Sequence, residues 1–218
     1  LANLGITSVA VVPNSGSTFY EAATALVSWT GANSGTLSTS GNFVDRVFLS
    51  SDTALGGGDV LLGSYVQGAT IAAGGTWSRT LSVTLPAGPT PAYILVVTDA
   101  LDSIEEGTRE NDNTGATAAP IVIEPAPRPD LVATITGNPA SWQAGASVQV
   151  AWNVANNGAA VASGPWTDGV YLSTDAVLTA ADTQLRLQPY SLSLAPGASY
   201  NRSVSVELPT DYEGGPRY

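Results

Sequence analysis

The stretch Trp77-Ser-Arg-Thr-Leu-Ser-Val-Thr-Leu85 decides the fold of this 218-residue chain. Its apolar and hydroxyl-bearing residues fall on opposite faces of an extended backbone. One face carries Trp77, Leu81, Val83 and Leu85, and the other carries Ser78, Thr80, Ser82 and Thr84. A period of two is typical of a half-buried β-strand and does not fit a helix.

Segments of the same kind lie between turns rich in Gly, Pro, Asn and Ser. They cover residues 4–12, 23–30, 43–50, 60–66, 76–85, 92–98 and 117–123. No window of useful length shows helical periodicity. Short alternating strands separated by turn signals predict an all-β, seven-stranded immunoglobulin-like or fibronectin-like β-sandwich.

Residues 29–86 reappear at 152–209 without insertion or deletion, which indicates a tandem repeat. The matched positions lie 123 apart, and they include Trp29 with Trp152, Asp45 with Asp168, Arg79 with Arg202 and Pro86 with Pro209. We expect Trp29 and Trp152 to anchor two separate cores, because a small two-sheet core needs a large buried aromatic side chain.

The segment Glu124-Pro-Ala-Pro-Arg-Pro-Asp130 separates the two copies. Alternating prolines favour a short, semi-rigid connector. We therefore predict one domain over 1–124, a linker over 125–128 and a second domain over 129–218. Tyr218 corresponds to Tyr93, so the second domain is expected to lack its last two strands in this chain. Either a longer protein continues, or another chain supplies the strands by strand addition.

The composition excludes several kinds of chemistry. The chain has no Cys, His, Met or Lys, so the usual zinc ligands, the commonest general base and the thiol nucleophile are missing. Without Met, Leu1 is expected to be an internal or processed end. The net charge of −11 argues against nucleic-acid binding and against an anionic membrane surface. No apolar run approaches the ~20 residues of a membrane helix, so we expect no membrane insertion.

Several motifs resemble the bacterial cell-adhesion-related domain abbreviated CARDB. In the second domain they are Pro129-Asp-Leu131, Val150-Ala-Trp152 with Asn156-Asn-Gly158, Trp166-Thr-Asp-Gly-Val-Tyr-Leu-Ser-Thr-Asp175, Ala181-Asp182, Leu194-Ala-Pro-Gly197 and Ser205-Val-Glu-Leu-Pro209. The first domain has Val44-Asp-Arg-Val-Phe-Leu-Ser-Ser-Asp52, Gly58-Asp59, Ser82-Val-Thr-Leu-Pro86, Val96-Val-Thr-Asp99 and the closing Glu105-Glu-Gly-Thr-Arg-Glu-Asn-Asp-Asn113. It departs from the pattern by starting Ala2-Asn-Leu4.

The resemblance implies seven-stranded repeats of a large secreted or surface-anchored bacterial protein, with a structural or adhesive role. The implied partners are neighbouring repeats of the same protein, a surface glycan or protein, or other copies of the chain.

An acidic turn over 99–113 is the first candidate site. Its carboxylates are Asp99, Asp102, Glu105, Glu106, Glu110 and Asp112. Hard oxygen ligands at this density suit calcium, the one cofactor that we expect. Their spacing does not match an EF-hand loop. The alternative is a solvated turn whose Asp and Asn side chains cap their own backbone.

A second candidate is the pair Asp52 and Asp59, which recurs as Asp175 and Asp182. Two carboxylates seven residues apart suit a cation, but such aspartates more often begin and end a turn by accepting backbone N–H bonds. A glycosidase pair is not favoured, because tandem copies of one active site are rare and no aromatic substrate cleft is evident.

Strand parity gives a third prediction. Asp45 alternates with Val47 and Leu49, and Arg79 alternates with Trp77 and Leu81, so both charges point toward the apolar face. A buried charge is costly unless it is paired. We predict the ion pairs Asp45–Arg79 and Asp168–Arg202. The alternative is an Arg79 side chain that extends outward at a sheet edge.

Aromatic residues such as Tyr20, Tyr65, Trp142 and Tyr190 are candidates for stacking on sugars. Trp142 has no counterpart in the first domain and is either a ligand-facing platform or a residue packed on the linker.

Three functions follow from the sequence. The first is a non-catalytic extracellular spacer and adhesion repeat, with calcium as an optional stiffening ion. The second is a carbohydrate-binding accessory module of a secreted hydrolase, and the third is a fibre subunit assembled by strand complementation.

Overall fold

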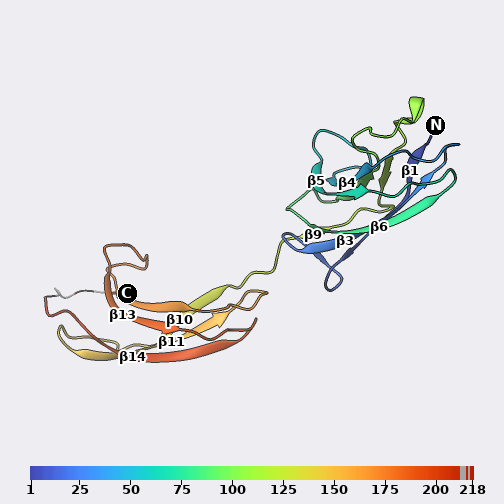
Figure 1. Cartoon of the computed structure of the whole chain (residues 1–218). Helices are drawn as coiled ribbons and strands as arrows, with labels where there is room; N and C mark the ends of the chain where they lie inside the picture. Colours follow the sequence, from blue (N-terminus) through green and yellow to red (C-terminus); the bar gives the residue numbers. More distant parts are fainter. Residues whose placement is uncertain (212–214, 216) are drawn as a thin grey trace. The chain divides into compact units, whose positions relative to one another are not determined.

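The computed structural model describes residues 1–211, 215, 217 and 218 (Figure 1). The chain divides into two compact units, Leu1–Ala126 (unit 1) and Pro127–Tyr218 (unit 2). The division falls inside the Pro-rich segment that the sequence marks as a connector.

Unit 1 is a sandwich of two antiparallel sheets, and it confirms the all-β prediction. The first sheet has the order β1-β3-β6, with β1 (Leu4–Pro13), β3 (Thr24–Asn33) and β6 (Thr76–Thr84). The second has the order β5-β4-β7-β8, with β5 (Val60–Gln67), β4 (Phe43–Ser50), β7 (Tyr93–Val97) and β8 (Thr114–Ala116). These seven strands make up the predicted number.

A short parallel pair adds to the sandwich and was not predicted. It joins β2 (Phe19–Tyr20) to β9 (Ile123–Glu124). The prediction of a final strand over 117–123 was wrong in its position, because β8 ends before this range and β9 begins at its last residue. Pro120 interrupts the range and has no N–H to give to a ladder, so only an isolated bridge between Ala92 and Ile121 forms there.

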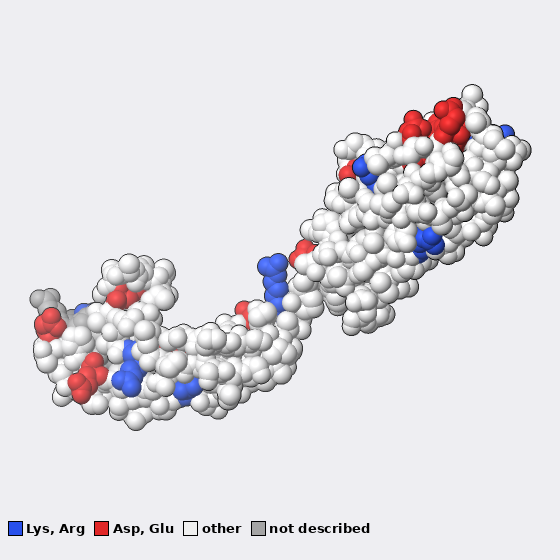
Figure 2. Space-filling model, viewed as in Figure 1, with Lys and Arg blue, Asp and Glu red and all other residues white. Residues whose placement is uncertain are grey.

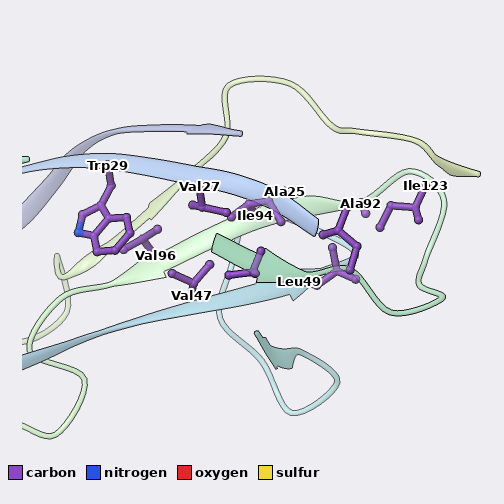
Figure 3. Close-up of a cluster of buried hydrophobic side chains, with 11 residues drawn as sticks. Ala25, Val27, Trp29, Val47, Leu49, Ala92, Ile94, Val96 and Ile123 are labelled. Carbon is purple, nitrogen blue, oxygen red and sulfur yellow. The ribbon is translucent and has the colours of Figure 1, made fainter. Parts of the chain in front are cut away.

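The core of unit 1 follows from alternation along its strands (Figure 3). On β3, Ala25, Val27 and Trp29 point inward, and every second residue of the strand is buried. They meet inward side chains of β4 and β7, among which are Val47, Leu49, Ile94 and Val96. A second cluster closes the end of the unit near the N-terminus and consists of Ala2, Leu4, Phe43, Ile71, Trp77 and Ile104.

Unit 2 repeats this plan with five strands among its described residues. One sheet has the order β10-β11-β14, with β10 (Leu131–Gly137), β11 (Ser147–Asn156) and β14 (Ser199–Glu207). The other pairs β12 (Trp166–Leu172) with β13 (Thr183–Tyr190). The core is a cluster of Val150, Trp152, Val154 and Val206.

One edge of β12 differs from its counterpart β4. In unit 1, β4 pairs with β5 on one side and with β7 on the other, and Ser50 lies opposite Tyr93. In unit 2, the backbone groups of Ser173 and Tyr218 exchange hydrogen bonds of 2.9 and 3.0 Å. Tyr218 therefore takes the position of Tyr93. A cleft of about 1010 Å³ beside β12 is lined by side chains that include Trp142, Val150, Val170, Leu172 and Tyr218.

No described helix is long and apolar enough to cross a membrane.

Candidate functional site

A buried carboxylate organises the centre of unit 1. Asp45 is 0% exposed and accepts hydrogen bonds on both oxygens. The indole Nε1 atoms of Trp29 and Trp77 donate to Oδ2 at 2.8 and 3.4 Å. The amide of Gln67 also donates to Oδ2, at 3.2 Å, and the hydroxyl of Thr98 donates to Oδ1 at 2.8 Å. Four donors from different strands or strand ends thus compensate the loss of solvent around the buried charge.

The predicted direct ion pair between Asp45 and Arg79 does not form in the described structure. Both side chains nevertheless lie on the inner faces that strand parity predicted. Among the described residues, Arg79 donates from Nε and Nη2 to Oε1 of Gln67, at 3.1 and 2.7 Å. Gln67 in turn donates to Asp45, so a neutral amide joins the two charges. The guanidinium lies 5.3 Å from the ring centroid of Tyr65. Because four donors already bind the carboxylate of Asp45, its charge is compensated without a direct bond to Arg79.

Unit 2 keeps the indole–carboxylate bond and changes its surroundings. Nε1 of Trp152 donates to Oδ2 of Asp168 at 2.9 Å. The hydroxyl of Tyr200, which stands at the position of Trp77, lies 2.8 Å from both oxygens of Asp168. Burial, followed by the hydrogen bond to Asp168 and then by the charge of Asp168, raises the pKa of Tyr200 to about 12, against the opposing effect of the hydrogen bond from Trp166. Asp168 is half-buried, whereas Asp45 is fully buried.

The predicted pair of Asp168 with Arg202 is also corrected within the described part of unit 2. The guanidinium of Arg202 lies 5.4 Å from the ring centroid of Tyr190 and 5.8 Å from that of Tyr200. Tyr190 stands where unit 1 has Gln67, so an aromatic ring replaces the amide relay. Tyr190 stacks on Tyr200 with a centroid distance of 4.2 Å, and on Trp166 at 4.6 Å. These aromatic rings pack on one another.

The repeated aspartate pairs act as turn caps. Asp52, Asp59, Asp175 and Asp182 accept hydrogen bonds from the backbone N–H groups of Ala54, Gly56, Val177 and Thr179, respectively. The hydroxyl of Ser173, and then the N–H of Thr179, lower the pKa of Asp182. The structure thus supports the capping alternative over a cation site.

The acidic turn does not gather its carboxylates at one point. Figure 2 shows acidic side chains at the end of unit 1 that carries the N-terminus. Asp99 is buried and accepts bonds from the N–H groups of Ser103 and Ile104, at 3.0 and 2.7 Å. Asp102 and Glu105 are exposed. Among the described residues, no group of three or more acidic side chains is placed to hold a metal. The prediction that the six carboxylates of this turn bind one calcium ion together was therefore wrong for the described residues.

Glu106 differs from the other acidic residues of the turn. It is only 2% exposed, and its Oε1 accepts a hydrogen bond from the N–H of Leu4. Burial is the main cause that raises the pKa of its carboxyl group, with smaller contributions from the nearby charges of Glu110 and Asp99. Its second oxygen, Oε2, has no partner, and the side-chain oxygens of Asn3 and Asn113 are equally buried and unpartnered.

A buried asparagine in each unit is a structural residue that the sequence analysis missed. Asn33 and Asn156 are both 0% exposed and lie 123 positions apart. The side-chain oxygen of Asn33 accepts the N–H of Asn3, and that of Asn156 accepts the N–H of Asp130, both at 3.0 Å. Each amide nitrogen then binds two loop carbonyls. The repeat spacing was the signal that could have identified these residues.

Trp142 packs onto unit 2. It lies against the core cluster around Trp152, and its Nε1 donates to the carbonyl of Pro139 at 2.9 Å. It also lines the cleft beside β12. Trp142 thus packs on the core of unit 2, and a ligand-facing role in the cleft stays a prediction.

Comparison with known proteins finds a family match for unit 2. The model of the CARDB family matches residues 128–215, which is almost the whole of unit 2. No curated protein matches the chain. A CARDB domain from Pyrococcus furiosus, solved in complex with di-metal ions, is 13% identical with a TM-score of 0.40, over 56% of this chain and 88% of that one. A red sea bream transglutaminase is 11% identical with a TM-score of 0.32, over 96% of this chain and 27% of that one.

Proposed function

We propose that the chain, whose second unit matches the model of the CARDB family, is a tandem of non-catalytic structural repeats in a large secreted or surface-anchored bacterial protein. In this role the units act as spacers and adhesion modules, and a calcium ion stabilises unit 1. The proposal rests above all on the duplicated core, in which Trp29 with Asp45 and Trp152 with Asp168 build the same centre twice.

The connections of unit 1 suit a chain under tension. β9 immediately precedes the Pro-rich connector and pairs in parallel with β2. The N–H of Glu21 also donates to the carbonyl of Glu124 at 2.9 Å. A pull on the two ends of unit 1 draws parallel strands in opposite directions, so these bonds are loaded together in shear. A spacer that transmits force benefits from such a pair.

Single-molecule stretching of the full chain tests this role. We expect two separate unfolding events, one for each unit. Ile123→Ala removes a side chain that is 8% exposed in the core, and it should lower the force of one event. Val122→Ala is the matched control, because Val122 is the adjacent residue and is 49% exposed. Extension of unit 1 without a distinct force peak, or equal effects of both variants, would contradict a force-transmitting role.

The edge of β12 favours strand complementation as a second candidate. The cleft beside it is lined partly by apolar side chains, and in unit 1 the equivalent space beside β4 holds Ile94 and Val96 of β7. A strand with this alternating pattern would complete the sheet. Sedimentation of the full chain over a range of concentrations tests whether another copy supplies it. Concentration-dependent polymers would support a fibre subunit, and a monodisperse monomer would contradict it.

A further inference from the structure

The corner of unit 1 where the N-terminus meets the acidic turn contains three buried oxygens without hydrogen-bond partners. They are Oδ1 of Asn3, Oε2 of Glu106 and Oδ1 of Asn113. The exposed fractions of these residues are 7%, 2% and 6%. Buried polar atoms are almost always paired, so three orphaned acceptors at one corner require an explanation.

Contacts between the backbone and side chains bring the three residues together. The N–H of Leu4 donates to the carboxylate of Glu106, which places this carboxylate beside the residue that follows Asn3. The side chain of Asn113 contacts the same carboxylate. The amide nitrogen of Asn3 lies 3.4 Å from Oδ2 of Asp112, the neighbour of Asn113. Thr98 holds Asn113 in place through its own N–H, which donates to the Asn113 carbonyl at 2.9 Å.

The corner has unsatisfied acceptors and excess negative charge. Oε1 of Glu110 accepts the N–H of Glu106 at 2.9 Å, so a second carboxylate lies close by. A proton on Glu106 would pair one oxygen with one neighbour and leave the third acceptor unpaired. A single cation bound by all three oxygens would satisfy each of them. The absence of a cluster of three carboxylates among the described residues does not exclude such a site, because amide oxygens are also calcium ligands.

We propose that this corner binds one calcium ion through the side-chain oxygens of Asn3, Glu106 and Asn113, with Asp112 and Glu110 supplying further negative charge. Oxygen-only ligands select a hard cation. Calcium accepts irregular positions and six to eight ligands, whereas magnesium demands near-ideal octahedral geometry. The site rests on the calcium part of the proposed function and names its ligand atoms. The ion would join the start of β1 to the acidic turn.

The test is the thermal unfolding of the full chain in millimolar calcium and in excess chelator. Glu106→Gln removes the buried charge at nearly constant size. Glu105→Gln is the matched control, because it removes the same charge from an exposed neighbour in the same turn. We expect calcium to raise the melting temperature of unit 1 by several degrees in the wild type and in Glu105→Gln, and not in Glu106→Gln. No shift in the wild type, or equal shifts in both variants, would overturn the site.

Asn3→Asp provides a second test if Glu106→Gln does not fold. Unit 2 carries Asp130 at the position of Asn3, and in both units the backbone N–H of this residue donates to the buried asparagine. The added carboxylate should lower the half-saturating calcium concentration several-fold in a calorimetric titration. An unchanged or weaker affinity would count against Asn3 as a ligand. The stretching experiment with Ile123→Ala does not depend on calcium, so the two proposals can fail separately.

Discussion

The indole of Trp29 donates a 2.8 Å hydrogen bond to the buried carboxylate of Asp45, and Trp152 donates to Asp168 at 2.9 Å in the same way. In both units the tryptophan precedes the aspartate by 16 residues. A bond that recurs between two sheets at the same place in two copies belongs to the plan of the module. It fixes how the two sheets of each unit lie against each other.

Asp45→Asn should destabilise unit 1 by about 1–3 kcal/mol, because an amide cannot accept from all four donors that now bind the carboxylate. Asp168→Asn should cost unit 2 less, since Asp168 is half-buried and water can take over part of its hydrogen bonding. Denaturant unfolding of both variants measures the two losses. A larger loss of stability for Asp168→Asn than for Asp45→Asn would contradict the expectation that the more deeply buried carboxylate contributes more.

Asn156→Asp should destabilise unit 2 more than Asn156→Ala does. The amide nitrogen of Asn156 donates to the carbonyls of Ala160 and Leu194, at 2.8 and 2.9 Å. An aspartate would place a buried negative charge against these two carbonyl oxygens, whereas alanine only leaves groups unpaired, at about 1–3 kcal/mol. The same order is expected at Asn33. Equal melting temperatures for the two variants would show that the amide donor is unimportant.

Gly35→Ala should destabilise unit 1, because a Cβ atom at this position would lie 2.5 Å from the backbone of Ala2 and Asn3. The N-terminal segment cannot move away without breaking the hydrogen bond from the N–H of Asn3 to Asn33. Gly56→Ala serves as the control, since a Cβ atom there would meet no other atom within 4 Å. Melting of the two variants side by side measures the difference. An unchanged melting temperature for Gly35→Ala would mean that the N-terminal segment shifts to make room for the Cβ atom without loss of stability.

The stability of unit 2 should fall as the pH rises from about 10 to about 12. The pKa of Tyr200 is about 12 in the folded unit against an ordinary value of 10.0, because burial disfavours the phenolate. Between these values the unfolded chain loses the proton while the folded unit keeps it, so unfolding is favoured as the pH rises. This contribution is fully present below pH 10 and is lost as the pH passes through the folded pKa.

A phenolate absorbance titration of the wild type and of Tyr200→Phe measures this pKa. The difference between the two curves should show one tyrosine that titrates near pH 12 or only on unfolding. A difference curve centred near pH 10 would mean that the folded unit does not shift Tyr200. Tyr171→Phe is the control variant, because it removes a tyrosine hydroxyl that lies 3.5 Å from Oε1 of Gln184 at the exposed surface.

The sequence specified much of the fold because alternation and repetition are local and countable. The face of β6 that carries Trp77 and the inward position of Asp45 both follow from strand parity. Partners were harder to predict. Asp45 meets Gln67 and Thr98 only after β5 and β7 have paired with β4, and nothing in the spacing indicates that an amide stands between Asp45 and Arg79.

The acidic turn shows the same limit. Its composition predicted calcium, but composition does not tell which carboxylates cap the backbone and which are buried. Asp99 binds two N–H groups of its own turn, whereas Glu106 reaches the N–H of Leu4, 102 residues away in the chain. The oxygens of Asn3 and Asn113 become candidates only through their burial without partners.

Differential scanning calorimetry of the full chain with Asp45→Asn, Asp168→Asn and the double variant tests the central claim most directly. The claim is that one module, built around an indole–carboxylate bond, occurs twice and folds twice. We predict two transitions, of which each single variant lowers a different one, and a double variant in which both shifts add. A single transition that both single variants lower would contradict two independent modules.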